Sequence, residues 1–304
     1  MCSSDLARLV IELAATDRSA FAAAARQRPP APPPLAVAPP PMPPANAAEL
    51  PLIVIDPGHG GLDPGARASN GTQEKDVVFD FSHGLQTRVE ATGRYRVMMT
   101  RASDVFIPLD ERVKIARDAG ASLFISIHAD TIGYETGISG ATVYTGADKA
   151  SDRQAARVAD SENRADAAAG IEPAQDDPGV SEILFDLTRR ETRAYSHVFA
   201  RTLIGYLRNA SRMNKNPHRS AGFRVLKAPD VPAVLLELGY LSSEKDLANL
   251  VAPEWRQKAA DNVLRAIDDF FRTRDGKAVR ADGPFGLKRD SDFEAGGVVA
   301  GAQR

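Results

Sequence analysis

The sequence predicts an α/β fold, in which a mostly parallel, twisted sheet of about six strands is flanked by helices. Short apolar runs typical of buried strands alternate with amphipathic helical segments from residue 49 to residue 147. This alternation is the pattern of repeated strand–helix–strand units. The chain is also long enough for one full core, because it has 304 residues, of which 43% are hydrophobic and 26% charged.

The first half of the expected domain runs strand, helix, strand, helix, strand. The first strand covers residues 52–55 and ends at Asp56-Pro57-Gly58, a sequence that breaks strands. A helix is expected over residues 74–93, where apolar residues recur at helical spacing after Thr72, a residue suited to cap it. The next elements are a strand at 95–100, a helix at 108–119 and a strand at 122–128.

The second half contains a segment that interrupts the alternation. After a strand at 140–145, which we expect to be antiparallel, residues 148–209 have the pattern of helix, acidic loop and helix. A compact α/β domain does not need so long an excursion, so this segment is a helical insertion with a purpose of its own. The alternation then returns with strands at 223–226 and 233–238 and a closing helix at 253–274.

The two ends of the chain lie outside the expected domain at 49–274. Residues 8–15 alternate like a strand but have no partner strand. Residues 1–28 are therefore either the remnant of a β-rich domain or a disordered or weakly helical arm. Residues 29–48 predict an extended proline-rich linker, and residues 275–304 a disordered tail.

Charge and cysteine content exclude several classes of function. The 38 basic and 40 acidic residues give a net charge of −2, so nothing indicates nucleic-acid binding or electrostatic attachment to a membrane. No apolar run approaches the roughly 20 residues that span a bilayer, and the first residues lack the features of a signal peptide. With Cys2 as the single cysteine, histidines and carboxylates must hold any metal.

Two histidines are expected at the carboxyl ends of two strands. His59 lies in the glycine-rich turn after the first strand, and His128 ends the strand at 122–128. Glu74 opens the helix after the first strand, at the same edge of the sheet, where open α/β folds bind their ligands. Two histidines and a glutamate are the ligand type of catalytic zinc sites that leave a position for water. These three residues are our candidate ligands for one Zn²⁺ ion.

Glu237 is the candidate catalytic residue. It follows three apolar residues at the end of the strand at 233–238, where burying a charge is costly unless something compensates it. A nearby dication would compensate it, and Glu237 would then act as a general base on the attacking water. The alternative is a buried ion pair between Glu237 and an arginine such as Arg219 or Arg224.

The remaining candidates carry weaker signals. His218 and Arg219 lie in a polar segment and are candidates for contacts with substrate. His83 and His197 fall on expected helices, where a surface or packing role is the simpler interpretation. The glycine-rich turn lacks the Gly-Lys-Ser/Thr ending of a phosphate loop, and no Gly-x-Ser-x-Gly motif occurs, so nucleotide binding and serine catalysis are unsupported.

Four separated motifs resemble those of a known family. They are IVIDPGHGGLDPGA at 53–66, EKD at 74–76, SIHAD at 126–130 and AGFRVLKAPDVPAVLLELGYLSSEKD at 221–246. Together they resemble the zinc-dependent N-acetylmuramoyl-L-alanine amidases of the Amidase_3 family, in particular the AmiA/AmiB/AmiC type of cell division. The resemblance implies cleavage of the amide between N-acetylmuramic acid and L-alanine in peptidoglycan. It assigns the zinc to His59, Glu74 and His128 and the catalytic role to Glu237.

The same resemblance implies a regulated, periplasmic enzyme, although a signal peptide is absent from this chain. Residues 1–28 resemble the remnant of an N-terminal AMIN domain. Residues 148–209 resemble a regulatory segment, in which a helix lies over the zinc cleft until an activator with a LytM-type domain displaces it. We expect Glu162 to occupy the water position of the zinc. Glu182 and Asp186 are weaker candidates, and a solvated helix face is the alternative.

Two other functions fit the same motifs. A zinc peptidase or deacetylase acting on cell-wall material would use the same ligand set, because the motifs specify metal-dependent hydrolysis more firmly than they specify the bond. A non-catalytic wall-binding module is the third possibility. The presence of all three ligands and of Glu237 argues against it. The expected partners are peptidoglycan and a LytM-domain activator, with neither nucleic acid nor stable membrane insertion.

Overall fold

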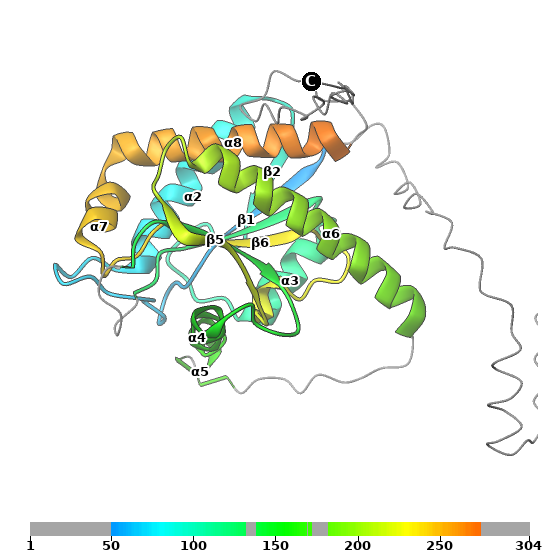
Figure 1. Cartoon of the computed structure of the whole chain (residues 1–304), viewed down its shortest axis with the longest axis horizontal. Coiled ribbons are helices and arrows are strands. Elements are labelled where there is room, and N and C mark those ends of the chain that lie inside the picture. Colours follow the sequence, from blue (N-terminus) through cyan, green and yellow to red (C-terminus); the bar gives the residue numbers. More distant parts are fainter. Residues whose placement is uncertain (1–49, 132–137, 169, 172–181, 275–304) are drawn as a thin grey trace, which may run out of the picture. The chain divides into compact units, whose positions relative to one another are not determined.

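The computed structural model describes residues 50–131, 138–168, 170–171 and 182–274, with residues 168 and 182–187 described as backbone alone. The predictions made for residues 1–28, 29–48 and 275–304 lie outside these ranges, as do the side chains of Glu182 and Asp186. Within the described ranges, one sheet carries helices on both faces, as the sequence predicts (Figure 1).

The sheet is mostly parallel. Its six strands among the described residues are β1 (Leu52–Pro57), β2 (Arg96–Met99), β3 (Leu123–His128), β4 (Ala141–Gly146), β5 (Met213–Ala221) and β6 (Ala233–Glu237). They lie in the order β2-β1-β3-β6-β4-β5. β2, β1, β3 and β6 run parallel to one another, β4 runs antiparallel to β6, and β5 runs parallel to β4. The antiparallel direction predicted for residues 140–145 is confirmed.

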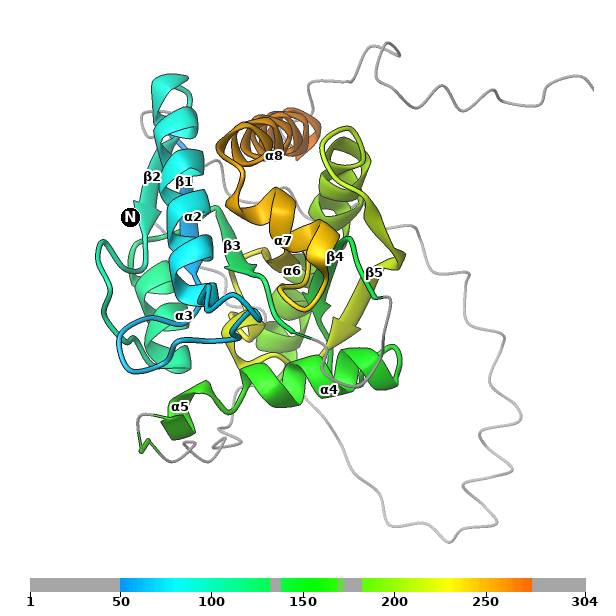
Figure 2. The same cartoon turned by 90° about the vertical axis from the view of Figure 1, so that its left-hand side faces the viewer.

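The helices divide between the two faces of the sheet (Figure 2). They are α2 (Glu74–Ala91), α3 (Leu109–Asp118), α4 (Arg153–Glu162), α5 (Ala165–Ala168), α6 (Glu182–Leu207), α7 (Glu244–Val251) and α8 (Pro253–Arg274), with the short 3₁₀ helix η1 (Arg224–Leu226). α2, α6 and α8 cover one face, and α3, α4 and η1 cover the other.

Alternation along the strands builds a core on each face. Ile53 and Ile55 of β1 point into the core under α2, α6 and α8, whereas Val54 points into the core that includes α3 and α4. β3 repeats the pattern, with Ile125 on the first face and Phe124 on the second. Successive side chains of a strand point to opposite faces, so a run of apolar residues is what a strand buried on both sides requires.

Two expected elements were wrong in detail. Residues 223–226 do not form a strand, because Arg224–Leu226 is a 3₁₀ helix, and the sixth strand is instead β5. The sequence of β5, MNKNPHRSA, is mostly polar because it lies at the edge of the sheet, where Pro217 is also tolerated. Thr72 does not cap α2, since the helix begins after Gln73, whose side chain makes no capping hydrogen bond.

The second half of the predicted insertion at 148–209 is part of the core. Phe199, Leu203 and Leu207 of α6 are at most 1% exposed and pack in the cluster that includes α8. The first half, which carries α4, lies on the opposite face. None of the helices in the described part of the chain is long and apolar enough to cross a membrane.

Replacing Leu85 tests the core under α2. Leu85 is fully buried in this core, and we expect Leu85→Ala to lower the free energy of unfolding by about 2–5 kcal/mol through lost burial and a residual cavity. Leu62→Ala is the matched control, because Leu62 is 77% exposed and its loss should stay below about 0.5 kcal/mol. Denaturant unfolding measures both. Equal losses would contradict this packing.

Candidate metal centre and active site

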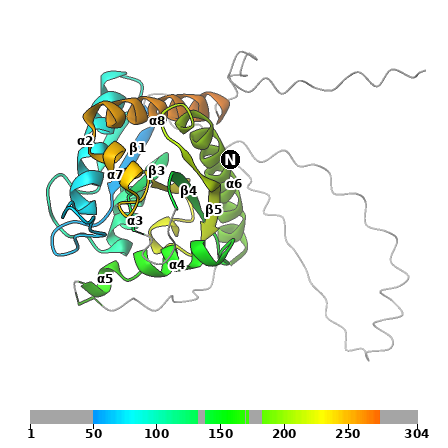
Figure 3. The same cartoon turned by 60° about the vertical axis from the view of Figure 1, so that its left-hand side comes forward.

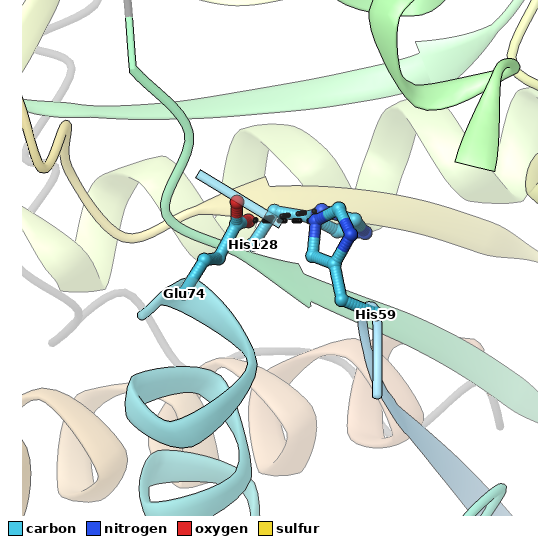
Figure 4. A group of neighbouring side chains, drawn as sticks. All are labelled: His59, Glu74 and His128. Carbon is cyan, nitrogen blue, oxygen red and sulfur yellow. Dashed lines mark ion pairs between the residues drawn. The ribbon is translucent and has the colours of Figure 1, made fainter. Parts of the chain in front are cut away.

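The candidate residues meet at the carboxyl edge of the three central parallel strands. His128 ends β3 and Glu237 ends β6, and the two are directly paired in the register of these strands. His59 lies two residues beyond β1, and Glu74 is the first residue of α2. Figure 4 shows the side chains of His59, Glu74 and His128 converging from three different elements. The sequence reasoning had selected all four residues for this edge.

The distances suit a shared cation. Oε1 of Glu74 lies 3.1 Å from Nε2 of His59 and 3.3 Å from Nδ1 of His128. The ligand atoms of these three residues all lie within 4.8 Å of one another, and all three side chains are buried. Neither of these two ring nitrogens has a hydrogen-bond partner among the described residues. Two imidazoles and one carboxylate with free donor atoms facing one point are the donor set of a catalytic zinc site.

A surrounding layer of hydrogen bonds fixes the three side chains. Nδ1 of His59 donates a hydrogen bond to Oδ2 of Asp63 at 2.8 Å. The lone pair of Nε2 is therefore available to bind a metal ion. Glu74 accepts the backbone N–H groups of Ala66, at 2.9 Å, and of Ala129, at 2.8 Å. Asp63 was not among the predicted residues, although its position four residues after His59 in the same turn was a usable signal.

The electrostatics of the cluster favour positive charge at its centre. Burial opposes protonation of His59 and His128, but the charges of Glu74 and Glu162 outweigh it and raise the pKa of both rings above the usual value. Burial would also raise the pKa of Glu74, yet the two histidines hold it well below the usual range. A metal cation bound in place of the protons on His59 and His128 would supply the same positive charge beside the carboxylates.

Two glycines make room for the rings. A Cβ on Gly58 would lie 2.5 Å from Cε1 of His128, and a Cβ on Gly65, where φ is +63°, would lie 2.6 Å from Cδ2 of His59. Neither position tolerates a side chain without moving a candidate ligand. These glycines of the motif therefore allow the chain to approach the candidate ligands closely.

One carboxylate oxygen of Glu237 accepts a hydrogen bond, and the other has no hydrogen-bond partner among the described residues. Oε2 accepts the backbone N–H of Asp130 at 3.1 Å, whereas Oε1 has no hydrogen-bond partner in the described part of the chain. Burial, and then the charge of Asp130, raise the pKa of Glu237 well above its usual range. The alternative of an ion pair with Arg219 or Arg224 is not supported, because both guanidinium groups bind other carboxylates.

The last residue of α4, Glu162, reaches the same centre. Its Oε2 lies 3.1 Å from Nδ1 of His128 and 3.6 Å from Nε2 of His59, and the residue is only 5% exposed. The cavity beside these three residues has a volume of about 10 Å³, which is close to the smallest space that holds one water molecule. Figure 3 shows α4 running below β4 and β5 in this view, and Glu162 and Asn163 line this small cavity together with His59 and His128.

Polar contacts hold both ends of α4. At its start, Asp152 caps the helix by accepting the N–H of Ala155 at 2.9 Å and also pairs with Arg219 of β5. Arg219 further donates to Gln154 at 2.6 Å. At its end, Asn163 donates to the carbonyl of Gly222 at 2.9 Å. These contacts of Arg219 secure α4, and the substrate contact predicted for this residue stays a prediction.

Beyond α4, Asp166 in the short helix α5 ties the same segment to α3. Its Oδ1 accepts the backbone N–H of Leu109 at 2.9 Å, and its Oδ2 binds Arg224 at 3.0 Å. Arg224 also pairs with Asp110 of α3. Asp166 is 2% exposed, so this link is a buried one.

His218 lies in a different environment. It is part of β5, where its Nε2 lies 3.2 Å from Oγ1 of Thr145 on β4 and its ring centroid lies 5.2 Å from that of His197 on α6. These contacts join β5 to β4 and α6, not to the three candidate ligands. A role in binding substrate stays a prediction for this residue as well.

Comparison with known proteins decides the family. A family model described as N-acetylmuramoyl-L-alanine amidase matches residues 53–269. The chain belongs to this amidase family. AmiC of Escherichia coli O6:H1 is 35% identical over 240 residues, which cover 76% of this chain and 57% of AmiC. AmiA of Escherichia coli K12 is 33% identical over 231 residues, which cover 76% of this chain and 79% of AmiA.

The amidase relatives differ in length, and the solved ones share the fold. AmiC of Neisseria meningitidis is 35% identical, with 73% of this chain and 53% of AmiC covered, so the chain spans about half the length of the two AmiC relatives. The catalytic domain of CwlV from Bacillus (Paenibacillus) polymyxa superposes with a TM-score of 0.54 at 24% identity. That match covers 73% of this chain and 98% of CwlV. It shows a shared amidase fold.

The pair His197 and His218 makes the stability of this chain depend on pH. Burial, followed by the charge of Arg201, lowers the pKa of His197, and burial followed by the charge of His197 lowers the pKa of His218. The folded protein therefore binds protons at these rings less readily than the unfolded chain, whose histidines titrate near pH 6.5. The contribution of the two neutral rings to the stability of the folded state is complete above that pH and is lost as the pH falls from about 7 to 5.

Replacing His218 tests this dependence. With one ring removed, we expect the Tm of His218→Gln to fall less between about pH 7 and pH 5 than the Tm of the wild type, as measured by thermal unfolding followed by circular dichroism. His83→Gln is the matched control, because His83 is exposed on α2, and it should follow the wild type. Parallel curves for all three proteins would show that the pair does not act in this way.

Proposed function

We propose that this chain is a zinc-dependent N-acetylmuramoyl-L-alanine amidase that hydrolyses the amide between N-acetylmuramic acid and L-alanine in peptidoglycan. The observation that carries the proposal is the buried donor set of His59, Glu74 and His128 beside the uncommitted Oε1 of Glu237. Membership in the amidase family supplies the substrate class. The donor set suggests the metal, since two imidazoles and one carboxylate with an open position suit a zinc ion that activates water for hydrolysis, the class of reaction named by the family.

The residues of the site have separable tasks in this reaction. A zinc ion in the donor set would polarise the scissile carbonyl and lower the pKa of the attacking water. Glu237 receives the proton of that water at Oε1, while the N–H of Asp130 holds Oε2 in place. As the carbon–nitrogen bond breaks, Glu237 returns the proton to the leaving nitrogen of L-alanine. Asp63 keeps His59 in the tautomer whose Nε2 faces Glu74.

We also propose that α4 inhibits the enzyme at rest, with the carboxylate of Glu162 in the water position of the zinc. The position of Glu162 close to both histidines supports this, as does the small volume left beside them. Glu162 is also the last residue of α4, where the helix dipole disfavours a carboxylate and a nearby cation stabilises it. A solvated helix face does not fit a side chain that is 5% exposed.

The proposed setting follows from the same family. An activator with a LytM-type domain would displace α4, and the enzyme would act in the periplasm in cell separation and wall remodelling. The CwlD amidase of Clostridioides difficile has been solved in complex with the GerS lipoprotein, at a TM-score of 0.50 and 21% identity to this chain. That complex is a precedent for a protein partner on this fold.

Mutation of Glu237 tests the reaction. We expect Glu237→Gln to bind zinc but to release about 10²- to 10⁴-fold less product from purified cell wall, because the amide cannot carry the proton. Glu244→Gln, at an exposed position on α7, is the matched control and should retain full activity. Mass spectrometry of cell wall digested by the wild-type chain should show free, intact stem peptides. Shortened peptides would indicate a peptidase, loss of acetyl groups a deacetylase, and no product a binding module.

Mutation of Glu162 tests the inhibition. If its carboxylate holds α4 over the zinc, Glu162→Ala should raise the activity measured without an activator by about tenfold for each 1.4 kcal/mol of lost contact. Asp160→Ala changes an exposed acidic residue on the same helix and should leave that activity unchanged. Unchanged activity of Glu162→Ala on purified cell wall, with the protein folded, would refute the proposed inhibition.

A further inference from the structure

Two buried arginines bind the main chain that leads to His59. Arg112 of α3 is 2% exposed. Its Nη1 donates to the carbonyl of Pro57 and its Nη2 to the carbonyl of His59, both at 2.8 Å. Arg101, after β2, is 3% exposed and donates to the carbonyls of Pro57 and Gly58, both at 3.1 Å. Three successive carbonyls of the turn are thus held by side chains that come from two other elements.

The turn needs such external support. His59 has a φ of +58°, and no other non-glycine residue in the described part of the chain has a positive φ. This conformation is unfavourable for L-residues. Gly60 and Gly61 follow directly, with φ values of +124° and +58°, and glycines leave the backbone free to adopt many conformations. Local sequence alone therefore does not fix the position of the His59 backbone.

A buried carboxylate compensates the charge of Arg112. Nη1 of Arg112 also pairs with Oδ1 of Asp56 at 2.8 Å. Asp56 is fully buried and accepts the hydroxyls of Thr100, at 2.6 Å, and Ser126, at 2.7 Å. The third nitrogen, Nε, donates to the carbonyl of Ile107 at 2.9 Å. A buried guanidinium whose three nitrogens all donate hydrogen bonds forms a rigid support.

We propose that Arg112 is a positioning residue for the metal centre. It fixes the main chain of His59, and Asp63 fixes the ring, so that Nε2 reaches the point shared with Glu74 and His128. The inference rests on the proposed metal site and adds a determinant of zinc affinity that does not touch the metal. The effect requires the planar fork of an arginine, because four oxygens at fixed positions share one guanidinium.

The test is the zinc affinity of Arg112→Lys in the full chain. A lysine keeps the charge beside Asp56 but cannot serve the carbonyls of Pro57, His59 and Ile107 at once. We expect the zinc dissociation constant, measured by competition with a chelator, to rise about 10- to 100-fold. Arg117→Lys is the matched control, because Arg117 lies on the same helix and pairs only at the surface with Asp230. Its zinc affinity should equal that of the wild type.

A second variant separates positioning from general stability. Asp56→Asn weakens the buried ion pair but leaves the carbonyl bonds of Arg112 in place, so its zinc dissociation constant should rise less than that of Arg112→Lys, even at an equal loss in Tm. If Arg112→Lys does not fold, the double variant Asp56→Asn with Arg112→Gln removes both charges together and should show the same loss of affinity.

The outcomes are distinct. Wild-type affinity in Arg112→Lys or in the double variant would overturn the inference and leave the metal site intact. Equal losses of affinity in Arg112→Lys and Asp56→Asn would also overturn it, because the effect would then follow stability. A wild-type chain that binds no zinc would overturn the metal site and the inference together. None of these results depends on an assay of amidase activity.

Discussion

Charge buried at the carboxyl edge of the sheet is the constraint on which the rest of this structure depends. Glu74, Glu162 and Glu237 are at most 5% exposed. Ligand atoms of Glu74 lie within 4.8 Å of those of His59 and His128, and ligand atoms of Glu162 and Glu237 lie within 4.8 Å of one another and of His128. Ionised carboxylates in such surroundings are costly unless they are hydrogen-bonded and paired with positive charge. The backbone N–H groups of Ala129 and Asp130 supply some of the hydrogen bonds. The raised pKa values of His59 and His128 indicate that the cluster also favours positive charge. Zinc ligation would answer the same requirement.

The topology of the sheet explains why these residues meet. β1, β3 and β6 are parallel neighbours, so their carboxyl ends share one edge, and the register sets His128 directly beside Glu237. β4 runs the other way, so Gly146 at its end lies at the opposite edge. The chain then returns through α4, whose ten residues span about 15 Å and end at Glu162. One reversal of strand direction thus brings the carboxylate of Glu162 to the candidate metal ligands from the far side.

Sequence alone predicts what depends on local pattern. His128 ends a strand, His59 lies two residues after one and Glu74 opens a helix, so apolar periodicity and strand-breaking residues locate them. β5 was missed because an edge strand does not need an apolar run. Arg112 was missed for a different reason: its donors bind the carbonyls of Pro57 and His59, 55 and 53 residues away along the chain, and the carboxylate of Asp56, 56 residues away. Charged side chains on a helix give no signal of such a role, and only the packing of α3 against the turn after β1 reveals it.

The strength with which α4 is held decides whether the proposed inhibition can be reversed. Its buried apolar side chains are Ala155, Val158 and Ala159, and the valine contributes only about 1.5–3 kcal/mol of burial. The hydrogen bonds of Asn163 and Asp166 add about 0.5–1.5 kcal/mol each, or somewhat more where a charge is involved. The contacts of Arg219 with Asp152 and Gln154 add to these. Detaching α4 therefore costs several hydrogen bonds and little apolar burial, which the binding free energy of one protein interface can offset. Under the proposed inhibition, a larger apolar face on α4 would oppose release of the helix, because more apolar surface would have to be exposed to water.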